Sequence, residues 1–285
     1  MRLALLLLLA AGVTPAPSQS PASRPSAASR PSVAALDRVV SIGASLSNGF
    51  GNGFPPARLL QQIITGKHQP VAQETSDVFF LNPEQVGDKQ IAGALKKKAT
   101  LVLGFDYLFW FGYGHMRGTS RARVAGKFVR DESALEVGQR VALLERGLAL
   151  LDKLDLPLVI GDLPDMWGAD EAMLSPVQIP SANTLERLNA RIRAWAAARG
   201  NVLVLPVSQW VALMRDGKLT LPDGAKADLA SKNLLQGDRL HPTRLGVIAV
   251  MSHLVVELRR WLGKGADQAL RFDTQAAIEE YGDEK

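Results

Sequence analysis

The sequence contains no cysteine among its 285 residues and only four histidines. The lack of cysteine excludes disulfides, cysteine-bound zinc, iron–sulfur clusters and thiol nucleophiles. Four histidines without a His-Glu-x-x-His pattern leave little for a metal site, so we expect neither metal nor cofactor. Any covalent catalysis is therefore expected to use an oxygen nucleophile.

The sequence also lacks an excess of either charge. Lysine and arginine number 33 against 28 acidic residues, and the net charge is +5, with hydrophobic residues at 47%. These values are typical of a globular protein and provide for one sizeable core. The densest basic run extends from Arg117 to Arg130. We interpret it as a solvated loop, with a rim attracting anionic substrates or envelope polymers as the alternative, and expect no nucleic-acid partner.

The two ends differ in composition from the rest of the chain. One arginine precedes nine apolar residues at 3–11, which predicts a signal peptide over residues 1–16 and a secreted or periplasmic protein. That run is far shorter than the ~20 residues that span a bilayer, although a retained anchor is the alternative. Without cysteine the protein is not a lipoprotein. We expect a Pro/Ser/Ala-rich disordered linker at 17–35, one domain at 36–265 and an acidic polar tail at 266–285.

Short apolar runs alternate with helical patterns through the domain. Apolar runs predict strands at residues 37–43, 76–81, 100–105, 156–161 and 201–207. Apolar residues every three or four positions predict helices at 56–65, 83–98, 134–154, 208–217 and 243–262, with another helix between Asn183 as its cap and Gly200. Five strands without polar alternation indicate a parallel sheet covered on both faces. We therefore predict an α/β fold, a flavodoxin-like three-layer sandwich.

Three residues able to perform nucleophilic catalysis lie beside the predicted strands. Ser45 follows the first strand, and Asp238 and His241 form an Asp-x-x-His pattern before the last helix. Serine needs a base to become nucleophilic, and a carboxylate orients the histidine that serves as one. Taken singly, Ser45 also fits a turn or helix cap, and His241 a hydrogen-bonded loop residue. Together, in this order, they predict a catalytic triad.

The stretches VVSIGASLSNG (39–49) and GDRLHPTRLG (237–246) resemble the first and last motif blocks of the SGNH/GDSL hydrolase superfamily. The resemblance covers residues 36–263 and implies the fold of that superfamily. It also implies a secreted serine hydrolase without a cofactor that cleaves a carboxylic ester. The candidate activities are esterase, lipase-like enzyme or carbohydrate deacetylase. The implied substrate is a small-molecule or polysaccharide ester, with the envelope surface as a further candidate partner.

The sequence departs from the pattern of this superfamily at two positions. Ala44 stands where the first block usually has aspartate, and Asp106 stands where the third block has an asparagine that donates to the oxyanion. An ionised carboxylate only accepts hydrogen bonds and would repel an oxyanion. Asp106 is therefore expected to be protonated or to turn away from the oxyanion. The alternative is that backbone N–H groups alone form the oxyanion hole. The resemblance implies an oxyanion hole from Ser45, Gly87 and the Asp106 region, and Asp106→Asn is expected to raise the rate if the carboxylate hampers the hole.

An aromatic run at residues 105–116 follows the third predicted strand. We expect Phe105, Tyr107 and Trp110 to bind an acyl or sugar group, with plain core packing as the alternative. Two other functions stay open. One is a weakened or inactive hydrolase scaffold that binds envelope carbohydrate or lipid, suggested by Ala44 and Asp106. The other is an acyltransferase that uses the same serine.

Overall fold

The computed structural model describes residues 31–114, 123–124, 127–128, 130, 133–222 and 233–282. The predicted signal peptide, most of the predicted linker and most of the basic run between Arg117 and Arg130 lie outside the described residues. Among the helices of the described segments, none combines the length and the apolar character that crossing a membrane requires.

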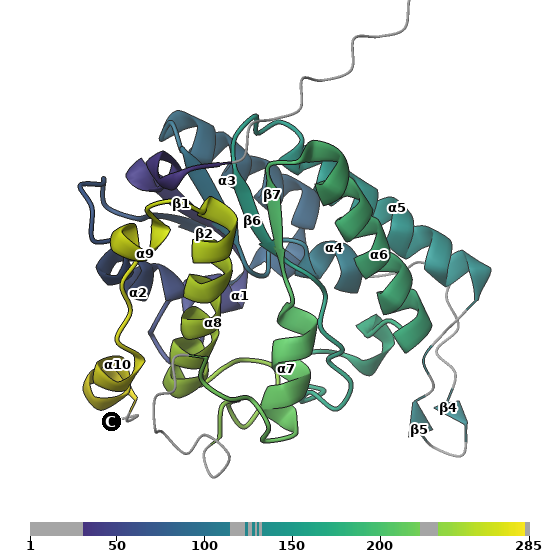
Figure 1. Ribbon diagram of the computed structural model, residues 1–285. Helices are drawn as coiled ribbons and strands as arrows, with labels where there is room; N and C mark the ends of the chain where they lie inside the picture. Colours follow the sequence, from purple (N-terminus) through teal and green to yellow (C-terminus); the bar gives the residue numbers. More distant parts are fainter. Residues whose placement is uncertain are drawn as a thin grey trace, which may run out of the picture.

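A five-stranded, all-parallel sheet forms the centre of the domain (Figure 1). Its strands are β1 (Val39–Gly43), β2 (Ala72–Thr75), β3 (Leu101–Gly104), β6 (Leu158–Gly161) and β7 (Val202–Leu205). They lie in the order β2-β1-β3-β6-β7, which is the order of flavodoxin-like sheets. The predicted α/β class and parallel sheet are confirmed. In this topology the chain reverses its winding at β1 and β3, where a ligand crevice is expected.

Helices cover both faces of the sheet, and Figure 1 shows α8 and α2 on one side of it and α5 and α6 on the other. Alternate residues of the inner strands enter two separate cores: Val39 and Leu103 belong to one, and Val40 and Val102 belong to the other. The inner strands are therefore buried on both sides, which explains their unbroken apolar sequence. The first core is closed by α2 (Pro56–Ile63), α7 (Val207–Arg215) and α8 (Arg244–Leu262). The second is closed by α3 (Pro83–Lys96), α4 (Phe109–Tyr113), α5 (Ala134–Leu151) and α6 (Ala182–Arg199).

The second predicted strand is wrong in position. The edge strand β2 is Ala72–Thr75, whereas residues 79–81 form the short 3-10 helix η2 (Phe79–Leu81). Only Phe79 of the apolar run is buried, and its neighbours Val78, Phe80 and Leu81 are exposed by 52%, 43% and 71%. The apolar run at residues 76–81 is therefore a largely exposed segment around one buried ring, and not a buried strand. The true edge strand is polar because solvent reaches it.

Two further expectations need correction. The cap of α6 is Ser181, whose hydroxyl accepts the Thr184 amide, rather than Asn183, whereas Gly200 ends the helix with φ 74° as expected. The residues after 265 do not form a separate tail. They include α9 (Ala266–Ala269) and α10 (Thr274–Tyr281), which bury Ala266 and Ala277 in the core beside α8. The folded domain therefore continues to the end of α10.

Candidate active site

The three residues predicted as a triad lie together at the carboxyl end of the sheet. Ser45 begins the short helix α1 (Ser45–Asn48) directly after β1, and His241 lies in the loop before α8. The Ser45 hydroxyl oxygen lies 2.9 Å from Nε2 of His241, and Nδ1 of His241 lies 2.7 Å from Oδ2 of Asp238. Both distances are those of hydrogen bonds. The side chains therefore form one continuous chain from hydroxyl to imidazole to carboxylate.

The loop of residues 238–241 fixes its own carboxylate. Oδ1 of Asp238 accepts hydrogen bonds from the amides of Leu240 and His241, at 2.9 and 3.0 Å. Partial burial would raise the pKa of Asp238, but the hydrogen bonds from the His241 ring and the two amides outweigh burial and lower the pKa from the usual value of an aspartate. Asp238 is therefore ionised at neutral pH and oriented toward the imidazole. The His241 ring is buried and contacts Phe50, with ring centroids 4.6 Å apart.

The turn that carries Ser45 begins at Gly43, whose φ of 140° favours glycine. A Cβ atom there would lie 2.2 Å from Asp106 and 2.5 Å from the Ser47 hydroxyl, so no larger residue fits. The side chain of Gln90 pairs with both backbone groups of Gly43, at 2.9 and 2.8 Å. Gln90 lies on the buried face of α3 together with Ile91. Sequence reasoning missed Gln90, although a polar residue on the apolar face of a predicted helix was a usable signal.

Asp106 holds the same turn from the other side. Its Oδ1 accepts the Ala44 amide at 2.9 Å and the Ser47 hydroxyl at 2.6 Å. Its Oδ2 accepts the Leu46 amide at 2.8 Å and the Ser47 amide at 3.4 Å. Burial raises the pKa of Asp106, and these four donors oppose the rise. All four hydrogen bonds that the carboxylate accepts therefore come from the turn that carries Ser45.

One amide of this turn stays available. The Ser45 N–H has no hydrogen-bond partner within the segments that the structure covers, while the amides of Ala44, Leu46 and Ser47 all donate to Asp106. An unpaired N–H next to a reactive hydroxyl is the usual position of an oxyanion-hole donor. Asp106 thus binds its neighbours and leaves the Ser45 amide free beside the Ser45 hydroxyl.

The other predicted oxyanion donor is misplaced. Gly87 lies inside α3, four residues past its first residue Pro83, so its amide belongs to the hydrogen-bonding pattern of the helix. A Cβ atom at Gly87 would lie 2.8 Å from the Tyr107 hydroxyl oxygen, deep in the second core. Gly87 is therefore a close-packing position, and it is not part of the pocket lining beside Ser45.

A pocket with about 580 Å³ of empty space, part of it open to solvent, adjoins Ser45 and His241. Phe105 and Trp110 line it, as predicted. Tyr107 does not: its ring is fully buried and contacts the ring of Phe79 edge-on, with centroids 5.6 Å apart. The expectation that Tyr107 binds substrate is therefore wrong, because its side chain faces the core while its neighbours face the pocket.

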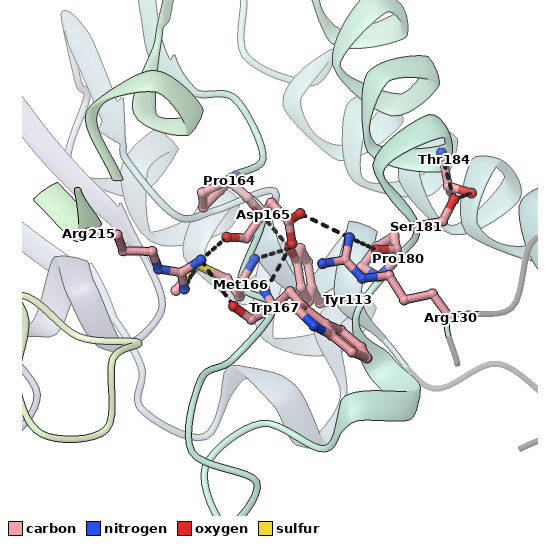
Figure 2. A network of polar contacts seen from close by, with 10 residues as sticks. All are labelled: Tyr113, Arg130, Pro164, Asp165, Met166, Trp167, Pro180, Ser181, Thr184 and Arg215. Carbon is pink, nitrogen blue, oxygen red and sulfur yellow. Dashed lines mark hydrogen bonds and ion pairs between the residues drawn. The ribbon is translucent and has the colours of Figure 1, made fainter. Parts of the chain in front are cut away.

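One wall of the pocket is the turn after β6, and Figure 2 shows the side chains that hold it. The Tyr113 hydroxyl donates to the Pro164 carbonyl and accepts the Met166 amide at 3.1 Å. Arg130 binds the Asp165 carboxylate at 2.9 Å. Since Pro164 and Met166 both line the pocket, these contacts fix its shape.

Arg215 on α7 links this wall to the loop of residues 238–241. Its guanidinium donates to the carbonyls of Asp165 and Trp167 (Figure 2) and, at 3.1 Å, to the carbonyl of Arg239. The Asp170 amide adds a second link, a 2.8 Å hydrogen bond to the Asp238 carbonyl. The pocket wall and the loop carrying His241 therefore form one braced unit.

Within the residues that the structure describes, no three histidine or acidic side chains gather in a way that could hold a metal ion.

No protein-family model matches the chain, and no curated protein matches it. Among solved structures, the chain is similar to a gut microbial diltiazem-metabolizing enzyme, with a TM-score of 0.49 and 15% sequence identity. The similarity covers 80% of this chain and 48% of that one, so the chain spans about half the length of that enzyme. The site is therefore interpreted from its own geometry.

Proposed function

We propose that the protein is a serine hydrolase that cleaves a carboxylic ester through Ser45, His241 and Asp238. The observation that carries the proposal is the pair of hydrogen bonds, 2.9 Å from Ser45 to His241 and 2.7 Å from His241 to Asp238. A general base must lie about 2.6–3.2 Å from the group it deprotonates, and His241 satisfies this. The ionised Asp238 holds the imidazole in the orientation that exposes Nε2 to the serine.

The reaction follows from this arrangement in two acyl-transfer steps. The Ser45 oxygen attacks the ester carbonyl carbon while His241 takes the hydroxyl proton, and the oxyanion forms beside the Ser45 N–H. The bond from carbon to the alcohol oxygen then breaks, and His241 gives its proton to the leaving alcohol. Water repeats the attack on the acyl-serine with His241 again as base, which releases the acid and restores Ser45.

The absence of a side-chain amide at position 106 has a kinetic consequence. Loss of one oxyanion donor costs about 10²–10³ in rate in other enzymes of this kind. We therefore expect a modest turnover in which the Ser45 amide is the main oxyanion donor identified. An added alcohol or sugar acceptor distinguishes hydrolysis from acyl transfer through the same serine.

Labelling with a fluorophosphonate probe, together with hydrolysis of p-nitrophenyl acetate, tests the proposal. The probe is expected to attach to Ser45, as located by mass spectrometry, and Ser45→Ala is expected to abolish both labelling and hydrolysis. Ser175→Ala is the matched control because the Ser175 side chain makes no capping hydrogen bond at the start of the 3-10 helix Pro176–Gln178. Hydrolysis at the wild-type rate by Ser45→Ala would remove the proposal, and absence of any label would favour a binding protein.

We also propose that the enzyme acts outside the cytoplasm. The support is the sequence of residues 1–16, with one arginine before an apolar run and then small residues. Its expected substrates are small-molecule or polysaccharide esters of that compartment. Expression of the full chain in a bacterial host, followed by fractionation and N-terminal mass analysis, tests this. A mature protein in the cytoplasm that retains residues 1–16 contradicts it.

A further inference from the structure

The polar side chains of the pocket beside Ser45 are already engaged. Besides Ser45 and His241, the lining contains two carboxylates, Asp106 and Asp162. Oδ1 of Asp162 accepts the Ser208 amide and Oδ2 accepts the Ser208 hydroxyl, both at 2.7 Å. Asp106 accepts four donors from the Ser45 turn. Asp106 therefore has no acceptor site left for a hydroxyl group of a ligand, Asp162 keeps one acceptor site on each oxygen, and both would repel an acidic ligand.

The remaining side chains of the described lining are apolar, apart from the indole nitrogen of Trp110. Phe105, Phe109 and Trp110 form an aromatic wall around the start of α4. The other apolar side chains of the lining come from the turn after β6, from α7 and from the loop of residues 238–241. They are Leu163, Pro164, Met166, Val207, Val211 and Leu240. The lining therefore offers mainly burial of hydrocarbon and few polar contacts.

The aromatic wall is tied to the opposite wall. Phe109 stacks on Tyr113 with ring centroids 4.2 Å apart and planes 9° from parallel. The Tyr113 hydroxyl is bound to the opposite wall, at Pro164 and Met166. The position of Phe109 relative to the turn after β6 is therefore fixed by contacts within the protein.

The apolar surface continues beyond the pocket. The ring of Phe80 contacts that of Trp110, with centroids 5.7 Å apart, and Phe80 is 43% exposed. On either side of it, Val78 and Leu81 are exposed by 52% and 71%. Phe80 therefore extends the apolar surface of the pocket beyond Trp110 to η2, where two further apolar side chains are exposed.

We propose that this pocket binds an apolar acyl chain of several carbons, with the far end of the chain on Trp110 and Phe80. The inference rests on the proposed ester hydrolysis and names the acyl class that Ser45 accepts. The acyl chain stays attached to Ser45 through the acyl-enzyme, so the surface that begins beside Ser45 has to accommodate it. Acetylated sugars are poor substrates on this assignment, because an acetyl group leaves the aromatic wall uncovered.

A series of p-nitrophenyl esters from acetate to decanoate tests the acyl class. Each CH₂ that becomes buried is worth roughly a factor of four, so burial of about four or five of the six CH₂ groups that octanoate adds to acetate is expected to raise kcat/KM about 10²–10³-fold. A flat or falling series with Ser45 still labelled by fluorophosphonate overturns the acyl assignment and leaves the proposed function intact. Absence of labelling and of hydrolysis across the series removes both. A parallel series of alkyl acetates must show no comparable rise, since a rise there assigns the pocket to the alcohol instead.

Variants at Phe80 test the path beyond the pocket. Phe80→Ser is expected to lower the octanoate-to-acetate ratio of kcat/KM about tenfold, and Phe80→Leu, which keeps an apolar side chain, is expected to retain most of it. Leu95→Ser is the matched control, because Leu95 is 48% exposed on α3 and is not part of the pocket lining. An unchanged ratio in Phe80→Ser, with a normal unfolding transition, overturns the proposed path of the chain.

Discussion

Replacing Asp106 with asparagine changes the side chain that holds the Ser45 turn while keeping its size. Two carboxylate oxygens currently accept four donors: the amides of Ala44, Leu46 and Ser47 and the Ser47 hydroxyl. Asparagine has one acceptor oxygen, and its other terminal atom is an amino group that donates. At least one of the two donor sets must therefore face another donor.

The magnitude depends on which way the asparagine lies. If its oxygen replaces Oδ2, the amino group faces the Ser47 hydroxyl, which can rotate to accept, and the Ala44 amide, which cannot. The opposite orientation sets the amino group against two amides and is worse. In the better orientation a hydrogen bond to a charged acceptor, ~1.5–3 kcal/mol, is lost and an amide is left unpaired. Relief from burying a charge offsets part of this, and we expect a net loss of about 2–3 kcal/mol in the free energy of unfolding.

Activity is expected to fall with stability. Movement of the Ser45 turn by a fraction of an ångström displaces both the hydroxyl and the free Ser45 amide, and we expect kcat/KM to drop about 10–100-fold. Urea unfolding and p-nitrophenyl ester hydrolysis of the same preparations measure both quantities. From the sequence alone, a faster Asp106→Asn enzyme is expected if the carboxylate hampers the oxyanion hole. A variant that is as stable as the wild type and faster would refute the bracing role and restore that earlier expectation.

Three other substitutions test the same region. Asp238→Asn is expected to lower kcat about 10²–10⁴-fold with little change in unfolding, because the amide no longer stabilises the charged imidazole; steady-state kinetics and circular dichroism check it. Gln90→Leu is expected to lower the free energy of unfolding by about 1–3 kcal/mol, because the buried Gly43 N–H loses its partner while the Gly43 carbonyl keeps the Ser76 amide; urea unfolding measures it, and a loss below the error of the method contradicts it. Burial raises the pKa of Asp162, so the folded state takes up this proton more readily than the unfolded chain, and the wild type gains stability as pH falls through that pKa. Asp162→Asn can keep both contacts to Ser208 but does not titrate, so its stability relative to the wild type should decline between pH 7 and pH 4; a constant difference in urea titrations excludes the effect.

The parts of the fold that the sequence predicts well are those that depend on burial on two sides. The strands β1, β3, β6 and β7 are continuous apolar runs because helices cover both of their faces. The Asp-x-x-His pattern is similarly local, since one loop holds Asp238 and His241 in mutual contact. Position after a strand then predicts that Ser45 lies at the same edge of the sheet as this loop.

The features that the sequence does not predict depend on contacts between distant segments. The edge strand β2 has the polar sequence AQET, and only its pairing with β1 makes it a strand. Phe105 and Tyr107 are two residues apart after the same strand, yet Phe105 lines the pocket and Tyr107 is buried against Phe79. No periodicity of the aromatic run distinguishes the two. Which side chain faces the pocket is decided by how α4 turns back onto the sheet.

The two departures from the hydrolase pattern, Ala44 and Asp106, looked in the sequence like separate defects that pointed to a decayed scaffold. In space they are a single contact, because the Ala44 amide donates to Asp106 at 2.9 Å. Ala44 itself is buried in the second core, so an aspartate in its place would put a carboxylate among apolar side chains. An asparagine at position 106 would in turn disrupt the four donors that the carboxylate accepts. Both departures therefore fit the packing around the Ser45 turn, which favours a site with an alternative brace for its serine over a decayed scaffold.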